Sequence, residues 1–306
     1  VDKPLNFTIT RDIIKVQSVK MKELKDGIAY IRISQFQEHT ADDLAKHLIA
    51  LQKKQHLKGL VLDLRNDPGG LLNAAVGVVS TFIGKDQLVV STKGRTKEAN
   101  RSFKTRPSDY LNYGQNPNSD WVSKVPEEAK SVPMVVLINA ASASASEIVS
   151  GALQDHKRAK ILGQQSFGKG SVQTVLPLRP LDGGEPSTGI KLTTSRYYTP
   201  SGRSIQATGI TPDIEIADTA EGNYATFNIR EADLAHHLKS EKEKIAYEKK
   251  QKEEAKKQAD TDKQPELRYF FGDEKDFQLQ QAVKILKGEK YITGFEKTTA
   301  NLKRRI

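Results

Sequence analysis

The sequence of 306 residues contains no cysteine, so neither a disulfide framework nor a thiolate metal site can stabilise the fold. This absence fits a cytosolic, an envelope or a secreted protein and does not decide between them. The sequence also lacks a run of about 18 apolar residues, the length that a helix needs to span a bilayer. No signal peptide is visible. Because the chain starts at Val1 rather than Met, we expect a processed or truncated chain whose targeting segment has been removed.

Apolar residues make up only 37% of the chain, which indicates a core of ordinary size diluted by polar extensions. The formal net charge is +10. Lys and Arg are mostly interleaved with Glu and Asp, as on a solvated surface, and no basic motif with regularly spaced aromatic residues occurs. We therefore expect no nucleic-acid partner.

Three zones are expected along the chain, at residues 1–20, 21–219 and 220–306. The first holds two short strand-like segments. In the second, apolar strand-like segments alternate with helical patterns. The expected order is strand 28–33, a helix from residue 40, strand 60–64, helix 71–83, strand 133–138, a helix to about residue 156, and strands at 172–178 and 190–198. This order predicts an α/β fold with βαβ units and at least partly parallel strands.

Three further segments lie between or after these elements. Residues 97–130 are polar with little periodicity, which indicates an insertion or a lid. Residues 239–257 are dominated by Lys and Glu, as in a solvated helix or a linker. Residues 277–286 have the apolar spacing of an amphipathic helix. We expect this helix to pack against another chain or a partner protein, because the charged segment cannot hold it rigidly on the core. The alternative is that it folds back on its own domain.

The segment NAASASASEI at residues 139–148 lies where an apolar strand changes into a helix. Such a turn can present a hydroxyl above a sheet, while the first N–H groups of the helix face a developing negative charge. The small side chains leave room for a substrate. Taken alone, three serines before a helix also fit simple helix caps.

A serine nucleophile needs a base, and His156 is the only histidine near Ser144 in the sequence. It stands 12 residues further on. Along a continuous helix that separation is about 18 Å, so the imidazole cannot reach the hydroxyl. The other histidines lie on or beside the first helix or in the polar tail: His39, His47, His56, His236 and His237. The sequence gives no local sign of a Ser–His pair.

A lysine is the alternative base. Free lysine has a pKa near 10.4, so only about one molecule in a thousand is neutral at pH 7.4. A catalytic lysine must therefore be desolvated enough to lose its proton. Lys169 stands between Gly168 and Gly170, next to Phe167 and before an apolar strand, which suits that task. A loop lysine between two flexible glycines is the alternative interpretation.

Five motifs occur in collinear order between residues 7 and 216: DLRNDPGG (63–70), SASASEI (142–148), FGKGSVQ (167–173), YYTPSGR (197–203) and GITPD (209–213). With these motifs the sequence resembles the carboxy-terminal processing proteases, or tail-specific proteases, a family of Ser–Lys serine peptidases. The resemblance implies an α/β, protease/crotonase-like catalytic core. It also implies a remnant of a PDZ edge and linker strands at residues 1–20, and a helical C-terminal extension.

The resemblance also assigns roles to single residues. It implies that Ser144 is the nucleophile, that Lys169 is the general base and that Gln173 orients the lysine. If the strand is regular, the spacing of four residues puts Lys169 and Gln173 on one face. The implied oxyanion hole uses the backbone N–H groups of Ala145 and of a glycine after Pro68, Gly70 rather than Gly69. Three further residues match positions that support the site: Glu147, Asp155 and Ser166.

The expected function is a Ser–Lys endopeptidase that cleaves protein or peptide substrates near apolar C-termini, without a metal or a cofactor. The resemblance implies an extracytoplasmic location, in the periplasm of a Gram-negative bacterium, together with a homo-oligomer and a possible envelope adaptor. One alternative is an inactive peptide-binding relative, or a scaffold, whose serine and lysine are misaligned. Another is an acyl-thioester enzyme on the same fold, which would use an oxyanion hole without Lys169.

Overall fold

The computed structural model describes residues 17–54, 57–111, 119–178, 188–223, 230–234, 238 and 271–294. The strands expected at residues 7–10 and 13–16, and with them the expected PDZ remnant, lie outside the described residues, as does the charged segment 239–257. None of the described helices is long and apolar enough to cross a membrane.

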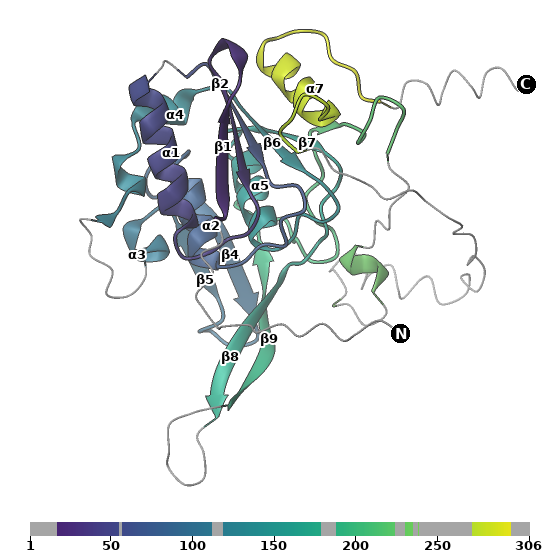
Figure 1. The fold of residues 1–306 in the computed structure, drawn as a ribbon. Coiled ribbons are helices and arrows are strands. Elements are labelled where there is room, and N and C mark those ends of the chain that lie inside the picture. The colour runs from purple at the N-terminus through teal and green to yellow at the C-terminus, as the bar shows by residue number, and fades with distance from the viewer. Residues whose placement is uncertain are drawn as a thin grey trace, which may run out of the picture.

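A six-stranded sheet forms the centre of the molecule (Figure 1). Its strands run in the order β1 (Val19–Glu23), β2 (Ile28–Ile33), β3 (Gly59–Asp63), β6 (Met134–Ile138), β7 (Lys160–Gly163) and β10 (Ile214–Glu215). The first pair is antiparallel, and every pair from β2 to β10 is parallel. The predicted mixed α/β fold with parallel strands is confirmed.

Three helices cover one face of this sheet: α1 (Thr40–Lys54), α2 (Leu72–Ser80) and α5 (Ala145–Asp155). Because side chains alternate along a strand, each central strand divides its apolar residues between the two faces. Leu60 and Leu62 of β3 join the large core under these helices, whereas Val61 points into a second core on the other face. This burial on both faces explains why the parallel strands read as continuous apolar runs.

A second, antiparallel sheet has the order β5 (Arg101–Lys104), β4 (Leu88–Gly94), β9 (Thr188–Tyr198) and β8 (Ser171–Leu178). Strands β8 and β9 extend away from the body as a long hairpin (Figure 1). Strand β8 begins two residues after Lys169, so this sheet carries the loop of the expected base. Two short 3-10 helices lie outside the sheets and the 97–130 segment: η1 (Lys25–Gly27) and η4 (Glu231–Asp233).

The polar segment 97–130 is more regular than its sequence indicates. Besides β5 it forms α3 (Pro107–Tyr110), η3 (Val122–Lys124) and α4 (Glu127–Ser131). Tyr110, Val122 and Ala129 are buried in the large core. Each of these elements contributes only one or two buried side chains, so its apolar residues are too few to show a helical or strand spacing in the sequence. Parts of this segment therefore pack on the core, and whether it acts as a lid stays a prediction.

The helix expected at residues 277–286 is present as α7 (Phe277–Leu286), but the prediction that it packs against another chain is wrong. It covers the second face of the central sheet (Figure 1), where Leu279 and Ala282 are buried against Val61, Val135 and Leu137. A parallel sheet needs cover on both faces, and α7 supplies it within the chain. The sequence argument failed because it judged the helix by its charged tether and not by the apolar sheet face that was still uncovered.

We expect Leu279→Ala to lower the free energy of unfolding by about 2–5 kcal/mol, because a nearly buried leucine is replaced by a cavity under α7. Urea unfolding followed by circular dichroism measures the change. Gln280→Ala, on the exposed side of the same helix, is the control and should cost less than about 0.5 kcal/mol. Equal effects of the two substitutions would contradict the docking of α7 on this sheet.

Candidate active site

Ser144 caps the N-terminus of α5 in an unusual backbone conformation, with φ 57° and ψ −110°. A non-glycine residue in this region carries strain of about 1–3 kcal/mol, which the surrounding structure must offset. Such strain is typical of sharp strand-to-helix turns that present a nucleophile. The strand before the turn is β6 and the helix after it is α5, as the sequence predicts.

The three serines of the turn have different surroundings. The hydroxyl of Ser142 donates to the carbonyl oxygen of Leu64 at 2.8 Å, and that of Ser146 donates to the carbonyl oxygen of Asp67 at 2.9 Å. Both serines are fully buried. Ser144 is partly exposed, and its hydroxyl donates a hydrogen bond to none of the described residues. Of the three, only Ser144 has a hydroxyl available for a substrate.

A single buried carboxylate connects the turn of Ser144 with the loop of Lys169. One oxygen of Glu147 accepts hydrogen bonds from the backbone N–H of Ser144 at 2.7 Å and of Lys169 at 2.9 Å. The other accepts from the hydroxyl of Ser166 and the N–H of Gly168, each at 2.6 Å. Glu147 has no exposed surface. The structure therefore brings Ser144, Glu147, Ser166 and Lys169 together.

The protonation of Glu147 is finely balanced. Burial raises the pKa of this carboxyl group to about 7, although the hydrogen bonds from Ser166, Gly168, Ser144 and Lys169 act in the opposite direction. A protonated carboxyl group turns one acceptor position into a donor, and it would then face N–H and O–H donors on both oxygens. The carboxylate is therefore the form that can hold both loops.

The glycines beside Lys169 allow close packing of its loop. A Cβ atom on Gly170 would lie 2.3 Å from the backbone nitrogen of Gln206, and Gly168 has a φ of +99°. The N–H of Phe167 donates to the carbonyl oxygen of Ser142 at 3.0 Å, which joins this loop to the serine turn a second time. The two glycines are therefore needed because the backbone of this loop packs closely against its neighbours. The alternative interpretation from the sequence, that they only make the loop flexible, does not account for this packing.

The loop after β3 lies directly against Ser144. A Cβ atom on Gly69 would meet the Cβ of Ser144 and the backbone nitrogen of Ala145, both at 2.8 Å. The N–H of Gly69 donates to the side chain of Asp67 at 2.8 Å, whereas the N–H groups of Gly70 and Ala145 have no acceptor among the described residues. Gly70 packs closely against Phe36: a Cβ atom on Gly70 would lie 2.0 Å from the carbonyl oxygen of Phe36, so no side chain fits at this position.

Asp67 is a second buried carboxyl group beside the site, and its sequence motif gives no hint of its surroundings. Its Oδ1 accepts from Gly69, but its Oδ2 is buried and has no hydrogen-bond partner among the described residues. Burial raises the pKa of Asp67 to about 7. Its backbone oxygen binds the N–H of Ala143 and the hydroxyl of Ser146, so the glycine loop and the serine turn are fixed to each other.

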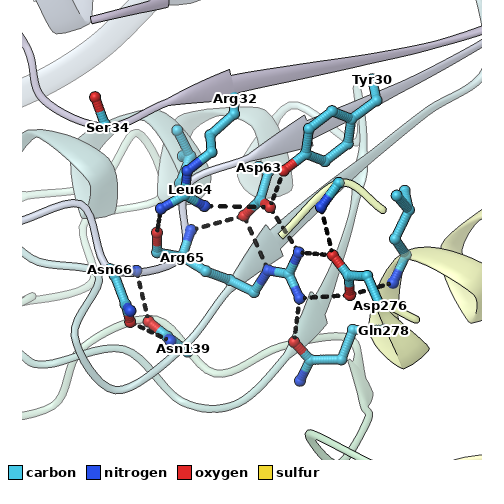
Figure 2. A network of polar contacts seen from close by, with 12 residues as sticks. Tyr30, Arg32, Ser34, Asp63, Leu64, Arg65, Asn66, Asn139, Asp276 and Gln278 are labelled. Atoms are coloured by element: carbon cyan, nitrogen blue, oxygen red, sulfur yellow. Dashed lines mark hydrogen bonds and ion pairs between the residues drawn. The ribbon is translucent and has the colours of Figure 1, made fainter. Parts of the chain in front are cut away.

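A further link between the two loops is the pair of Asn66 and Asn139 (Figure 2). The side chain of Asn139 accepts from the N–H of Asn66 at 3.0 Å and donates to its side-chain oxygen at 2.7 Å. Asn66 adopts a positive φ of 56°, a conformation that asparagine tolerates better than most residues. Sequence reasoning missed this pair because 73 residues separate its members.

Two expected site residues are not joined to this cluster. Asp155 lies at the far end of α5, roughly 16.5 Å from Ser144 at 1.5 Å per residue, and binds the N–H of Ser201 and the side chain of Arg203. Gln173 is exposed on β8. Because β8 begins at Ser171, the regular strand that would put Lys169 and Gln173 on one face does not reach Lys169.

His156 is the C-cap of α5, and its Nε2 lies 2.7 Å from the carbonyl oxygen of Leu88. We expect His156→Ala to change the catalytic efficiency by less than about 0.5 kcal/mol, roughly a factor of two, because the ring is remote from Ser144. Measurement of kcat/KM on a peptide between pH 6 and 9 tests this. A large loss confined to the acidic side of the profile would point to a histidine base and against Lys169.

No group of three His, Cys, Asp or Glu side chains suited to a metal ion occurs within the parts of the chain that the structure describes. The arrangement fits nucleophilic catalysis: an available hydroxyl in a strained turn, a lysine loop fixed beside it, and N–H groups without a described acceptor at the start of a helix and in a glycine loop.

Comparison with known proteins agrees with this chemistry. Residues 27–216 match the family described as Peptidase family S41. A carboxy-terminal-processing protease of Bartonella bacilliformis is 44% identical over 248 residues, which cover 79% of this chain and 51% of that protein. The carboxy-terminal processing protease CtpB of Bacillus subtilis is 36% identical over 217 residues, which cover 70% of this chain and 40% of that protein.

Among solved structures, the photosystem II D1 C-terminal processing protease has a similar fold, with a TM-score of 0.51 and 28% sequence identity. The match covers 66% of this chain and 49% of that one. The chain thus spans about half the length, or less, of these relatives.

Proposed function

Because the chain belongs to peptidase family S41, we propose that it is a serine endopeptidase in which Ser144 is the nucleophile and Lys169 the general base. The observation that carries the proposal is the buried Glu147 carboxylate, which binds the backbone N–H of both residues. A second observation supports it: the hydroxyls of Ser142 and Ser146 donate to backbone carbonyl oxygens, whereas that of Ser144 donates to none of the described residues.

In the proposed reaction the neutral amine of Lys169 takes the hydroxyl proton of Ser144 while Oγ bonds to the scissile carbonyl carbon. The electron pair of the C=O bond moves onto oxygen, and the N–H groups of Ala145 and Gly70 stabilise this oxyanion. The ammonium group of Lys169 then protonates the leaving amine as the C–N bond breaks. Water, deprotonated by Lys169, hydrolyses the ester on Ser144 and restores the enzyme.

The assignment of Gly70 rather than Gly69 to the oxyanion hole is supported by hydrogen bonding. The N–H of Gly69 already donates to Asp67, whereas that of Gly70 has no described acceptor. A side chain at either position would collide with neighbouring backbone or with Ser144. Gln173 keeps its proposed role as the residue that orients Lys169, and this role requires the amine to reach toward β8.

We further propose that the substrates are proteins cleaved near apolar C-termini. This rests on the carboxy-terminal processing activity that the names of the relatives state. The extracytoplasmic, periplasmic location, the homo-oligomer and an envelope adaptor remain proposals of the same kind. Helix α7 gives no support to self-association, because its apolar side is covered by the central sheet.

Mass spectrometry of products from a panel of unfolded proteins tests the proposal, with the Ser144→Ala chain as the control. We expect fragments cut near the C-terminus only with the unchanged chain. A serine-directed covalent probe should label Ser144 in the unchanged chain and not in Lys169→Ala. Labelling that does not depend on Lys169 would favour an acyl-thioester enzyme, and no labelling with no products would favour an inactive peptide-binding relative.

A further inference from the structure

The segment before and at the start of α7 enters a buried polar network with the loop that leads to Gly70 (Figure 2). Asp276, the N-cap of α7, forms a two-oxygen contact with the guanidinium group of Arg65, with N···O distances of 2.9 and 2.6 Å. Gln278 accepts a further bond from Arg65 at 2.9 Å. Arg65 and Asp276 are 3% and 6% exposed and stand 211 residues apart in the sequence.

The guanidinium group of Arg65 has every N–H donor occupied. Nε and one terminal nitrogen bind the two oxygens of Asp63, at 3.0 and 2.6 Å, and the remaining donors bind Asp276 and Gln278. Asp63 also accepts from Tyr30 at 2.6 Å and lies 3.3 Å from Arg32. The network thus balances two carboxylates against two guanidinium groups. Removal of one carboxylate would leave a buried positive charge without a counter-ion.

The network is continuous with the catalytic loop. The carbonyl oxygen of Arg65 accepts from Arg32 at 2.9 Å, which fixes the peptide between Arg65 and Asn66. Asn66 is in turn bound to Asn139 at the base of the serine turn. Gly70 stands only four positions after Asn66. A displacement of the Arg65 side chain is therefore passed to the loop that carries Gly70 by short, hydrogen-bonded backbone.

We propose that Asp276 is a positioning residue for the oxyanion loop, and that docking of the 271–279 segment through Arg65 completes the active site. The inference rests on the proposed peptidase function, because the task that it assigns to Asp276 is to position the N–H of Gly70 for the oxyanion. The network lies on the face of the sheet that α7 covers, and Ser144 lies at the start of α5 on the other face. Asp276 therefore acts on catalysis through Arg65 and not by touching a substrate.

The sharpest variant is Asp276→Asn. Asparagine is as good an N-cap as aspartate, so the hydrogen bond to the N–H of Leu279 is kept while the charge that faces Arg65 is lost. We expect kcat to fall about tenfold with KM changed little, because a shift of about 1 Å in a catalytic group costs up to 10²-fold in rate. Asp276→Glu, which restores the carboxylate, should recover part of the lost rate.

Two controls separate positioning from loss of stability. Leu48→Ala removes a buried side chain from α1, away from the network, and should lower the unfolding temperature while leaving kcat near wild type at 20 °C below it. Gln280→Ala changes an exposed residue of α7 and should leave both unchanged. If Asp276→Asn matches Leu48→Ala in kcat, the positioning role is overturned.

Two further measurements address the loop directly. A peptide aldehyde forms a tetrahedral adduct with a serine nucleophile, so its affinity should fall by the same factor as kcat in Asp276→Asn. Hydrogen–deuterium exchange of a fragment covering residues 66–71 should become faster in Asp276→Asn and not in Leu48→Ala. Unchanged exchange would also overturn the proposal.

The exchange measurement keeps the two proposals distinguishable. If the unchanged chain and Ser144→Ala are equally inactive, the peptidase function fails, yet exchange still shows whether Asp276 holds the 66–71 loop. If the unchanged chain is active but Asp276→Asn has the same kcat, aldehyde affinity and exchange as the controls, only the role of Asp276 fails.

Discussion

Ser144→Ala and Lys169→Ala are each expected to lower kcat/KM by more than about 10³-fold while leaving the fold intact. In the proposed reaction the attack needs both the hydroxyl and a neutral amine, so removal of either should stop the same step. Because the two residues act as a unit, the double variant should be hardly slower than either single variant. Steady-state hydrolysis of a peptide with an apolar C-terminus measures the rates, and thermal unfolding confirms that each variant is folded.

Lys169→Arg is the informative companion to this pair of substitutions. It keeps a positive charge and a long side chain, but a guanidinium group cannot give up its proton, so we expect the same loss of activity. Lys160→Ala, which removes an exposed lysine at the start of β7, is the matched control and should be fully active. Near-normal turnover in either Lys169 variant would contradict the assignment of Lys169 as the general base.

The helices and strands that position the site could be predicted from the sequence, because their apolar residues are the ones that are buried in the folded chain. All five residues of β3 and of β6 are buried, which is the pattern of parallel strands covered on both faces. The serine turn was found between β6 and α5 for the same reason. The choice of Ser144 over its neighbours rests on the resemblance, and the structure adds that the hydroxyls of Ser142 and Ser146 donate to backbone carbonyl groups.

Contacts between distant segments could not be predicted in this way. Nothing in the spacing of Arg65 and Asp276 indicates that they meet, because the contact depends on how α7 crosses the sheet. The prediction for α7 was wrong for the same reason. The sequence shows the apolar side of this helix, but it does not show the face of the sheet against which that side packs. Local patterns report how exposed a residue is, but they do not report what covers it.

The second large effect is expected for Glu147→Gln. An amide group has one oxygen and one NH₂, so one pair of donors, either Ser144 with Lys169 or Ser166 with Gly168, would face another donor. The turn of Ser144 is strained and depends on such bonds to keep its shape. We expect kcat to fall by about 10²-fold, the cost of misplacing reacting groups by about 1 Å.

The pH dependence of stability gives this prediction a second and independent readout. Burial raises the pKa of Glu147 to about 7 in the folded chain, above the value of about 4.3 expected in the unfolded chain. Between these values the folded state binds more protons, so the free energy of unfolding falls as pH rises from about 4.3 to 7. The stabilisation is complete below that window and lost above it.

Activity should change in the opposite direction across the same window, because the carboxylate form of Glu147 is the one that holds the loops of Ser144 and Lys169. The unchanged chain is therefore expected to be more stable but less active at pH 5.5 than at pH 7.5. Asp67, whose pKa burial also raises to about 7, adds a similar stability term, so Asp67→Asn should be measured alongside.

In Glu147→Gln the slope of the free energy of unfolding against pH should become shallower by up to about 1.4 kcal/mol per pH unit, the contribution of one proton. Urea unfolding at half-unit steps from pH 5 to pH 8 measures the slope. Glu128→Gln, at an exposed position of α4, is the control and should leave both slope and kcat unchanged. A Glu147→Gln chain with the wild-type slope and wild-type kcat would show that this carboxylate neither titrates in the window nor joins the two catalytic loops.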